Sequence, residues 1–301
     1  MTDFRTLGSE LSNWGRWGDD DRIGTVNLIT PECIAAAATL ARTGRVFDLG
    51  LTLGANGPQA GVGRINPVHL MSITGDTKMP DGGGFADDYI FMPLQCATQW
   101  DGLSHVFYDD HCYNNVPTST VTARGAAELG IEHLARGIVG RGVVLDIARL
   151  RGVDHLEPGD SVGPDDLQAA CEHQGVEVRP GDILLVRTGW IRVFKERSAA
   201  EYMGVNPGLT MECARWLKEH DVAALACDNW SVEPYPSGVD AVLPLHYVAI
   251  RDMGMTLGEM FDLEELATDC ASDGVWECFF TAPMLKIANA VGCPLNPLAI
   301  K

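Results

Sequence analysis

Short apolar runs alternate with helix-like segments along most of the 301 residues. The runs at 142–147, 183–187 and 222–227 have the length and apolar content of buried strands. The segments that we expect to be helical surround these runs, at 122–137, 165–174, 198–203, 209–220 and 262–270. Strands that alternate with helices are typical of an α/β fold. Because no repeat or low-complexity linker divides the chain, we expect a single domain over residues 1–301.

The first third of the chain has a different pattern. Thr30 as an N-cap and Pro31 in the first turn predict a helix that runs to Arg42. A strand is expected at 46–53. The stretch 54–88 is long and rich in glycine, proline and aspartate, which is typical of a functional loop.

The charge balance excludes several classes of partner. Acidic residues outnumber basic ones by 41 to 22, which gives a formal net charge of −19. Such a chain lacks the basic clusters that nucleic acids and anionic membranes require. The N-terminus does not resemble a signal peptide, and the nine cysteines are scattered without a CxxC motif. We therefore expect a cytoplasmic protein whose cysteines pack as small apolar residues.

The segment 95–105 offers several oxygen ligands at strand spacing. If it is extended, Gln95, Gln99 and Asp101 lie on one face, and His105 follows after a short turn. Converging donors with at least one carboxylate can bind a divalent cation. The same pattern also fits a polar strand edge with Trp100 packed inward, and spacing alone leaves both interpretations open.

This segment resembles the metal-binding signature of the putative cyclase family, which includes kynurenine formamidases and isatin hydrolases. The signature reads His-x-Gly-Thr-His-x-Asp-x-Pro-x-His. Thr98, Asp101 and His105 are identical to it, while Gln95 and Gln99 stand at its first two histidines. The form found here, Gln-x-x-Thr-Gln-Trp-Asp-x-x-x-His, is similar to that of a longer branch of the family.

The resemblance continues in the same order along the chain. Residues 184–190 resemble the family's LLRTGW segment, and 227–234 resemble its D-x-x-S-V-D-P loop. His246 and Glu259 are similar to its later histidine and glutamate. The resemblance covers roughly residues 45–265.

The family implies a swivelling β/β/α-type α/β fold and one divalent metal ion, zinc or manganese. By position, the resemblance implies metal ligands at Gln95, Gln99 and Asp101 and a catalytic acid/base at His105. It implies that His246 and Glu259 are either further ligands or catalytic proton carriers. Amide oxygens in place of two imidazoles favour a harder ion such as manganese. The resemblance also implies a homo-oligomer and an N-terminal extension, residues 1–44, that is a candidate cover for the active site.

Four tryptophans are candidates for the substrate pocket: Trp14, Trp17, Trp100 and Trp230. The first two stand in a glycine-rich acidic stretch that suits either a covering loop or a plug at the core edge. Trp100 and Trp230 flank motif residues and suit either a pocket wall or the core.

The segment Gly159–Gly163 matches a G-x-S-x-G nucleophile elbow around Ser161. An elbow requires a strand directly before it and a helix directly after it. Here Glu157 and Pro158 precede the motif and Pro164 follows it, so we interpret it as a loop that leads to a helix N-cap.

These observations predict a metal-dependent hydrolase that opens an amide or lactone bond in a small cyclic or aryl substrate, using metal-activated water. The alternatives are an arylformamidase acting on N-formylkynurenine, a metal-free binding protein on the same scaffold, and a serine hydrolase that uses Ser161.

Overall fold

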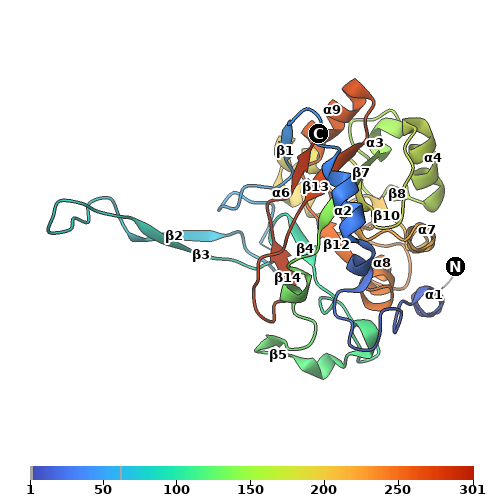
Figure 1. Cartoon of the computed structure of the whole chain (residues 1–301), viewed down its shortest axis with the longest axis horizontal. Helices are drawn as coiled ribbons and strands as arrows, with labels where there is room; N and C mark the ends of the chain where they lie inside the picture. Colours follow the sequence, from blue (N-terminus) through green and yellow to red (C-terminus); the bar gives the residue numbers. More distant parts are fainter. Residues whose placement is uncertain (1–2, 62) are drawn as a thin grey trace.

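A mixed β-sheet forms the centre of the molecule (Figure 1). The computed structural model describes residues 3–61 and 63–301, so residues 1–2 of the predicted extension and residue 62 of the predicted loop lie outside it. Within the described residues, nine strands join in one sheet, in the order β1 (Val46–Asp48), β15 (Leu298–Ile300), β13 (Glu277–Thr281), β7 (Val139–Asp146), β9 (Ile183–Arg187), β11 (Ala224–Cys227), β12 (Thr256–Glu259), β4 (Gln99–Asp101) and β14 (Gly292–Pro294).

The middle of the sheet is parallel and its margins are antiparallel. Strands β7, β9, β11 and β12 run parallel, with Val143, Leu184, Leu225 and Leu257 in register across them. Their residues are buried almost throughout, as expected of parallel strands covered on both faces. The three apolar runs of the sequence form β7, β9 and β11, which confirms those strands and the α/β class.

Helices cover both faces of the sheet. The face that carries Val143 and Leu184 packs against one core cluster with residues from α1, α4, α7 and η5. The opposite face, with Val144 and Leu185, packs against a second cluster with residues from α9 and η4. The helices are α1 (Phe4–Leu11), α2 (Pro31–Ala38), α3 (Ile147–Leu150), α4 (Pro164–Gln174), α5 (Ile191–Glu196), α6 (Ala199–Tyr202), α7 (Cys213–Glu219), α8 (Pro244–His246), α9 (Glu264–Asp273), the 3₁₀ turns η1 (Gly24–Leu28), η2 (Tyr113–Asn115), η3 (Thr118–Thr120) and η4 (Ile131–Leu134), and the π-helix η5 (Tyr247–Asp252).

Several predicted boundaries are confirmed and others are wrong. Thr30 caps α2 by accepting a hydrogen bond from the Cys33 amide, although the helix ends at Ala38. The helix predicted at 122–137 is wrong, because this region holds two short strands, β5 (Val121–Thr122) and β6 (Gly125–Ala126), and η4. Gly125 has a φ of 97°, which a helix does not allow.

The strand predicted at 46–53 ends at Asp48. Its partner strand β15 begins at Leu298, and Pro297 before it has no amide hydrogen to continue the ladder. The last bond of this pair runs from the Leu49 amide to the Pro297 carbonyl.

Two further small sheets lie outside the main one. The strands β8 (Ser161–Val162) and β10 (Gly208–Leu209) are parallel, and β2 (Val68–Ile73) and β3 (Asp87–Phe91) form an antiparallel hairpin that projects from the body (Figure 1). The nine cysteines are free, and all except Cys33 are buried. Among the described residues, no helix is long and apolar enough to cross a bilayer.

Candidate metal centre

Strand β4 sends alternate side chains to opposite faces of the sheet. Trp100 is fully buried in the second core cluster, with its ring tilted against Phe261 and edge-on to Phe280, and its indole donates to the Ala282 carbonyl. Gln99 lies opposite Glu259 in the antiparallel ladder, so both share the other face with Asp101. The buried tryptophan and the possible oxygen ligands therefore lie on opposite faces of the same strand.

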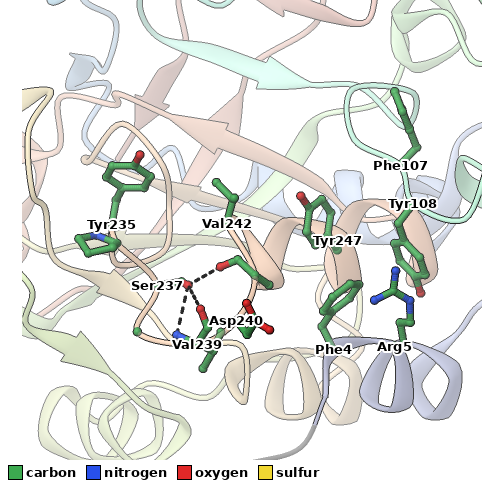
Figure 2. Close-up of a pocket in the computed structure, with 13 residues that line it drawn as sticks. Phe4, Arg5, Phe107, Tyr108, Tyr235, Ser237, Val239, Asp240, Val242 and Tyr247 are labelled. Atoms are coloured by element: carbon green, nitrogen blue, oxygen red, sulfur yellow. Dashed lines mark hydrogen bonds between the residues drawn. The ribbon is translucent and has the colours of Figure 1, made fainter.

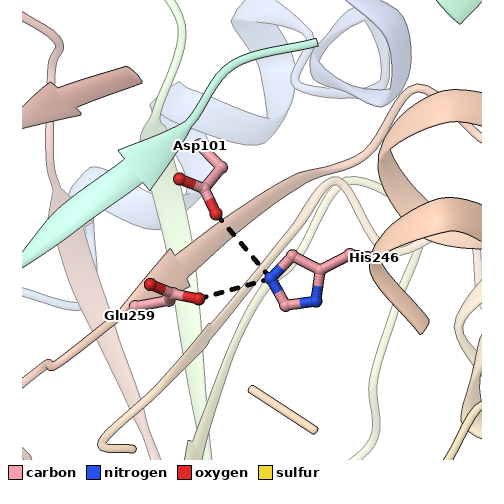
Figure 3. Close-up of side chains that lie close together, drawn as sticks. All are labelled: Asp101, His246 and Glu259. Atoms are coloured by element: carbon pink, nitrogen blue, oxygen red, sulfur yellow. Dashed lines mark hydrogen bonds and ion pairs between the residues drawn. The ribbon is translucent and has the colours of Figure 1, made fainter. Parts of the chain in front are cut away.

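Helix α8 brings His246 onto the face that carries these oxygens. Figure 3 shows the Asp101 and Glu259 carboxylates directed at one imidazole nitrogen of His246. The Nε2 atom lies 3.3 Å from Glu259 Oε1 and 3.8 Å from Asp101 Oδ2. One possible ligand atom from each of the three residues lies within 4.8 Å of the others, and all three side chains are buried.

Two buried oxygen atoms in this cluster have no hydrogen-bond partner. Gln99 Nε2 donates to Asp101 Oδ1 at 3.3 Å and to Glu259 Oε2 at 2.8 Å, which leaves Gln99 Oε1 without a donor. Asp101 Oδ2 also lacks one. Unpaired buried acceptors cost about 1–3 kcal/mol each, so native proteins rarely keep them. Two carboxylates, one imidazole and a free amide oxygen are a donor set that fits a divalent cation.

The electrostatics of the cluster indicate a shortage of positive charge. Burial, together with the nearby charge of Asp101, raises the pKa of Glu259 to about 7. Burial alone would lower the pKa of His246, but hydrogen bonds to Glu233 and Glu259 outweigh it and raise this pKa to about 10. Both raised pKa values favour the protonated forms of Glu259 and His246. A bound cation could supply the same positive charge in place of a proton.

Glu233 holds His246 in place and was not among the predicted site residues. This buried carboxylate accepts the His246 Nδ1 hydrogen at 2.6 Å and the backbone amides of Leu245 and His246, each at 3.0 Å. With Nδ1 occupied, Nε2 is the nitrogen that faces Asp101 and Glu259. Glu233 lies in the segment 227–234 that resembles the family's D-x-x-S-V-D-P loop, but nothing in the sequence of that segment indicates a contact with His246.

His105 lies at the margin of the cluster. Its Nε2 is 3.6 Å from Asp101 Oδ1, and its side chain is 20% exposed, more than any other member. Burial lowers the pKa of His105, and the charge of Asp101 opposes that shift. The imidazole therefore stands between the buried carboxylates and solvent.

Gln95 does not belong to strand β4, because the strand begins at Gln99. The alternation that grouped it with Gln99 and Asp101 therefore does not extend back to it. The Gln95 carbonyl accepts a hydrogen bond from Arg64, and its side-chain amide nitrogen lies against Gly292 of β14. Among the described residues, no hydrogen bond or ion pair joins Gln95 to the cluster.

A cavity of about 950 Å³ lies beside the segments that carry His105, Glu233 and His246 (Figure 2). Its walls come from the start of α1, from the residues that follow His105, and from the loop between Glu233 and His246. Aromatic and apolar side chains dominate the lining, including Phe4, Phe107, Tyr108, Tyr235, Val242 and Tyr247. The extension thus contributes to this cavity through α1.

The four candidate tryptophans do not line this cavity. Trp100 packs in the core. The Trp14 indole donates to the Arg251 carbonyl, and its ring borders a different cavity of about 710 Å³. Trp17 lies beneath the Arg16 guanidinium, and the Trp230 indole donates to the Gly204 carbonyl.

Ser161 is not part of a catalytic triad in this structure. It is exposed in the two-residue strand β8, and α4 begins at Pro164 after the N-cap Gly163. Asp228 accepts hydrogen bonds from Thr188 and from the Gly189 amide. Neither Asp228 nor His246 shares a hydrogen bond with Ser161 among the described residues, so the elbow motif is a loop that leads to a helix.

Comparison with known proteins places the chain in a family. Residues 31–234 match the model described as Putative cyclase. A crystal structure described as a novel cyclase is 41% identical, with a TM-score of 0.91 over 98% of this chain and 99% of that one. No curated protein gives a significant match.

More distant structures share the fold. Isatin hydrolase A from Labrenzia aggregata is 21% identical, with a TM-score of 0.65 over 89% of this chain and 97% of that one. A predicted metal-dependent hydrolase from Bacillus stearothermophilus is 15% identical, with a TM-score of 0.54 over 85% and 97%. These likenesses confirm the fold implied by the sequence motifs. The match over residues 31–234 and the 41% identical cyclase structure show that the chain belongs to the putative cyclase family.

Proposed function

We propose that this protein is a metal-dependent hydrolase that opens an amide or lactone bond in a small cyclic or aryl substrate. The observation that carries the proposal is the buried cluster of Asp101, His246 and Glu259, with unpartnered oxygens on Asp101 and Gln99. Proteins of the same fold are described as isatin hydrolases and as a predicted metal-dependent hydrolase, which supports the same chemistry here.

The residues of the cluster would divide into those that hold the ion and one that carries protons. Asp101, Glu259, His246 Nε2 and Gln99 Oε1 would hold one Mn²⁺ or Zn²⁺ ion. When bound, such an ion lowers the pKa of its water and polarises a carbonyl oxygen. His105 is the partly exposed imidazole, so it can take a proton from the attacking water and deliver one to the leaving nitrogen or oxygen.

The neighbouring cavity supports the substrate class. Its aromatic lining suits a planar ring, and its walls share segments with His105 and His246 (Figure 2). The net charge of −19 disfavours strongly anionic substrates. A weakly charged cyclic amide, lactone or N-acyl aryl compound fits both observations.

Calorimetric titration of the chelator-treated protein with Mn²⁺ and Zn²⁺ tests the metal. We expect one ion per wild-type chain and binding weakened by more than about 100-fold in Asp101→Asn, because a charged ligand is lost. Asp182→Asn is the matched control, since Asp182 is also buried but pairs with Arg141 away from the cluster. A wild-type chain that binds neither ion would contradict the proposal and favour a metal-free binding protein.

A substrate panel then separates the enzymatic alternatives. The panel contains isatin, aryl lactones and N-formylkynurenine, each assayed with and without chelator. Ring opening that stops with chelator and returns with added ion supports the proposal. Hydrolysis restricted to N-formylkynurenine would identify an arylformamidase instead, and activity that resists chelator would exclude the metal mechanism.

A further inference from the structure

Arg64 is a half-buried arginine that pairs with no carboxylate among the described residues. Most arginines of this acidic chain do form such an ion pair. The others that lack one, Arg42, Arg124 and Arg136, are exposed to water. A guanidinium that is partly removed from water loses hydration, and a hydrogen-bonded anion can offset that loss. Arg64 therefore keeps the capacity to bind an anion.

Hydrogen bonds hold the segment that carries Arg64 against the residues that lead into β4. The guanidinium donates from Nη1 to the Gln95 carbonyl at 3.0 Å. Gln59 and Asn66, which flank Arg64, share two hydrogen bonds of 3.0 Å, and the Gln59 side chain donates to the Cys96 carbonyl at 3.0 Å. Because β4 begins shortly after Cys96, these bonds fix Arg64 relative to the strand that carries the proposed ligands.

The charge of Arg64 reaches the candidate metal centre. Burial is the largest influence that lowers the pKa of His105, and the charge of Arg64 adds to it. Burial raises the pKa of Glu259, and the charge of Arg64 opposes that rise. Charge effects weaken with distance, so the guanidinium lies near both side chains. Its Nε and Nη2 atoms donate no hydrogen bond within the described part of the chain, which leaves them available to a ligand.

The candidate metal centre carries more negative charge than one divalent ion can balance. Asp101, Glu233 and Glu259 are three buried carboxylates, which exceed the charge of such an ion by one when His246 is neutral, as a metal ligand must be. Hydrolysis of an amide or lactone adds water across the C–N or C–O bond that breaks, and it forms first an oxyanion and then a carboxylate. A centre with excess negative charge would repel both. The positive charge of Arg64 offsets that excess.

We propose that Arg64 binds the negatively charged oxygen that the reaction creates, first as the oxyanion at the attacked carbonyl and then as the carboxylate of the opened product. This inference rests on the proposed function, because that reaction forms the anion. The planar guanidinium can donate two parallel hydrogen bonds to a carboxylate. Arg64 does not line the aromatic cavity, so the ring and the reacting group would be held by different parts of the chain. The substrate class narrows to cyclic compounds that open to an aryl carboxylate.

Calorimetric titration with benzoate and with benzamide, in the presence and absence of Mn²⁺, tests the proposal. The two probes have the same shape and differ in charge. Arg64→Met should weaken benzoate binding at least about tenfold and change benzamide binding less than about threefold, because a charge-assisted hydrogen bond is lost. Arg124→Met is the matched control, since Arg124 also lacks an ion pair but is exposed between β5 and β6.

The affinity for Mn²⁺ separates a loss of charge from a loss of structure. Removal of a positive charge near the candidate metal centre should leave Mn²⁺ binding in Arg64→Met as tight as in the wild type, or tighter. Arg64→Lys keeps the charge without the planar fork, so its benzoate binding should fall less than that of Arg64→Met. Joint loss of Mn²⁺, benzoate and benzamide binding in Arg64→Met would overturn the proposal and assign Arg64 a structural role.

The outcomes distinguish this inference from the proposed function. Benzoate binding that depends on Arg64 supports the inference, and an absence of ring opening in the substrate panel would then reject the proposed function alone. Ring opening with equal benzoate affinity in wild type and Arg64→Met would overturn the inference and leave the proposed function standing. Equal weakening of benzoate and benzamide would also overturn it, as would a wild-type protein that does not bind benzoate.

Discussion

The candidate metal centre and the arm formed by the β2–β3 hairpin, residues 68–91, depart from the ordinary distribution of polar and apolar groups in opposite directions. Asp101, His246 and Glu259 are charged or polar groups enclosed by the sheet, whereas Leu70 and Tyr89 are apolar groups exposed to solvent. Each arrangement is costly for an isolated chain. The two regions differ in what could offset that cost: a cation could do so at the candidate metal centre, whereas no described part of the chain covers the apolar side chains of the arm.

The two regions also differ in how firmly the backbone is constrained. Val232 and Met260 each have a φ of 58°, a left-handed conformation that non-glycine residues rarely adopt. Val232 comes directly before Glu233 and Met260 directly after Glu259, so both stand next to residues of the candidate metal centre. Such strain persists only where surrounding packing determines it, and both residues are fully buried. Most of the arm has no comparable packing around it.

The largest expected effect on stability comes from a pair of glycine substitutions, one next to Glu259 and one in the arm, which together test the difference in packing. A Cβ atom at Gly258 would lie 2.4 Å from Trp100 Cζ3 and 2.8 Å from Phe261, so Gly258→Ala should lower the free energy of unfolding by about 1–3 kcal/mol. Gly75, between the strands of the arm, has nothing within 4 Å. Gly75→Ala should change stability by less than about 1 kcal/mol, in the stabilising direction. If urea titrations gave equal losses of unfolding free energy for the two variants, the inferred difference in packing would be contradicted.

Glu233→Gln tests whether the candidate metal centre depends on a residue outside the proposed ligand set. A glutamine cannot accept all three hydrogen bonds that Glu233 receives from Leu245 and His246, so His246 loses its fixed orientation. We expect the affinity for Mn²⁺ or Zn²⁺ to fall by about 10–100-fold in calorimetry. Glu277→Gln, which alters an ion pair with Arg141, serves as the control. Unchanged metal affinity in Glu233→Gln would show that the carboxylate supports only the fold.

The smallest effect is expected at the ion pair between His69 and Asp88 on the arm. The imidazole of His69 and the carboxylate of Asp88 are 53% and 58% exposed, so water and salt screen their attraction. Asp88→Asn should therefore change the free energy of unfolding, measured in urea, by less than about 0.5 kcal/mol. A loss of more than about 1 kcal/mol would contradict this expectation and show that the ion pair stabilises the arm despite its exposure.

Local patterns predicted the parts of the fold that depend on neighbouring residues. The apolar runs gave β7, β9 and β11, and the N-cap and proline gave the start of α2. The helix at 122–137 failed because Gly125 adopts a positive φ, packed against Asn289, which is far away in the sequence. The arm was predicted only as a loop, since its pairing depends on a turn of more than ten residues between its strands.

The residues of the candidate site divide in the same way, into those that local motifs indicated and those that only long-range contacts reveal. The motifs pointed to Gln99, Asp101, His105, His246 and Glu259, and the fold brings these five side chains together. Gln95 was grouped with them by a strand period that does not reach it. Glu233 was missed because its role depends on α8 presenting His246 to it, and no local spacing records that contact.

The sequence by itself determined the α/β alternation, the acidic balance and the residue types available for metal chemistry, because these follow from composition and from short-range periodicity. Only the tertiary structure decided which of those residues meet. Gln99 and Glu259 are 160 positions apart and share a hydrogen bond because β4 and β12 are paired in one sheet. Long-range pairing of this kind depends on the packing of the whole chain, and the same packing left the apolar side chains of the β2–β3 hairpin outside the core.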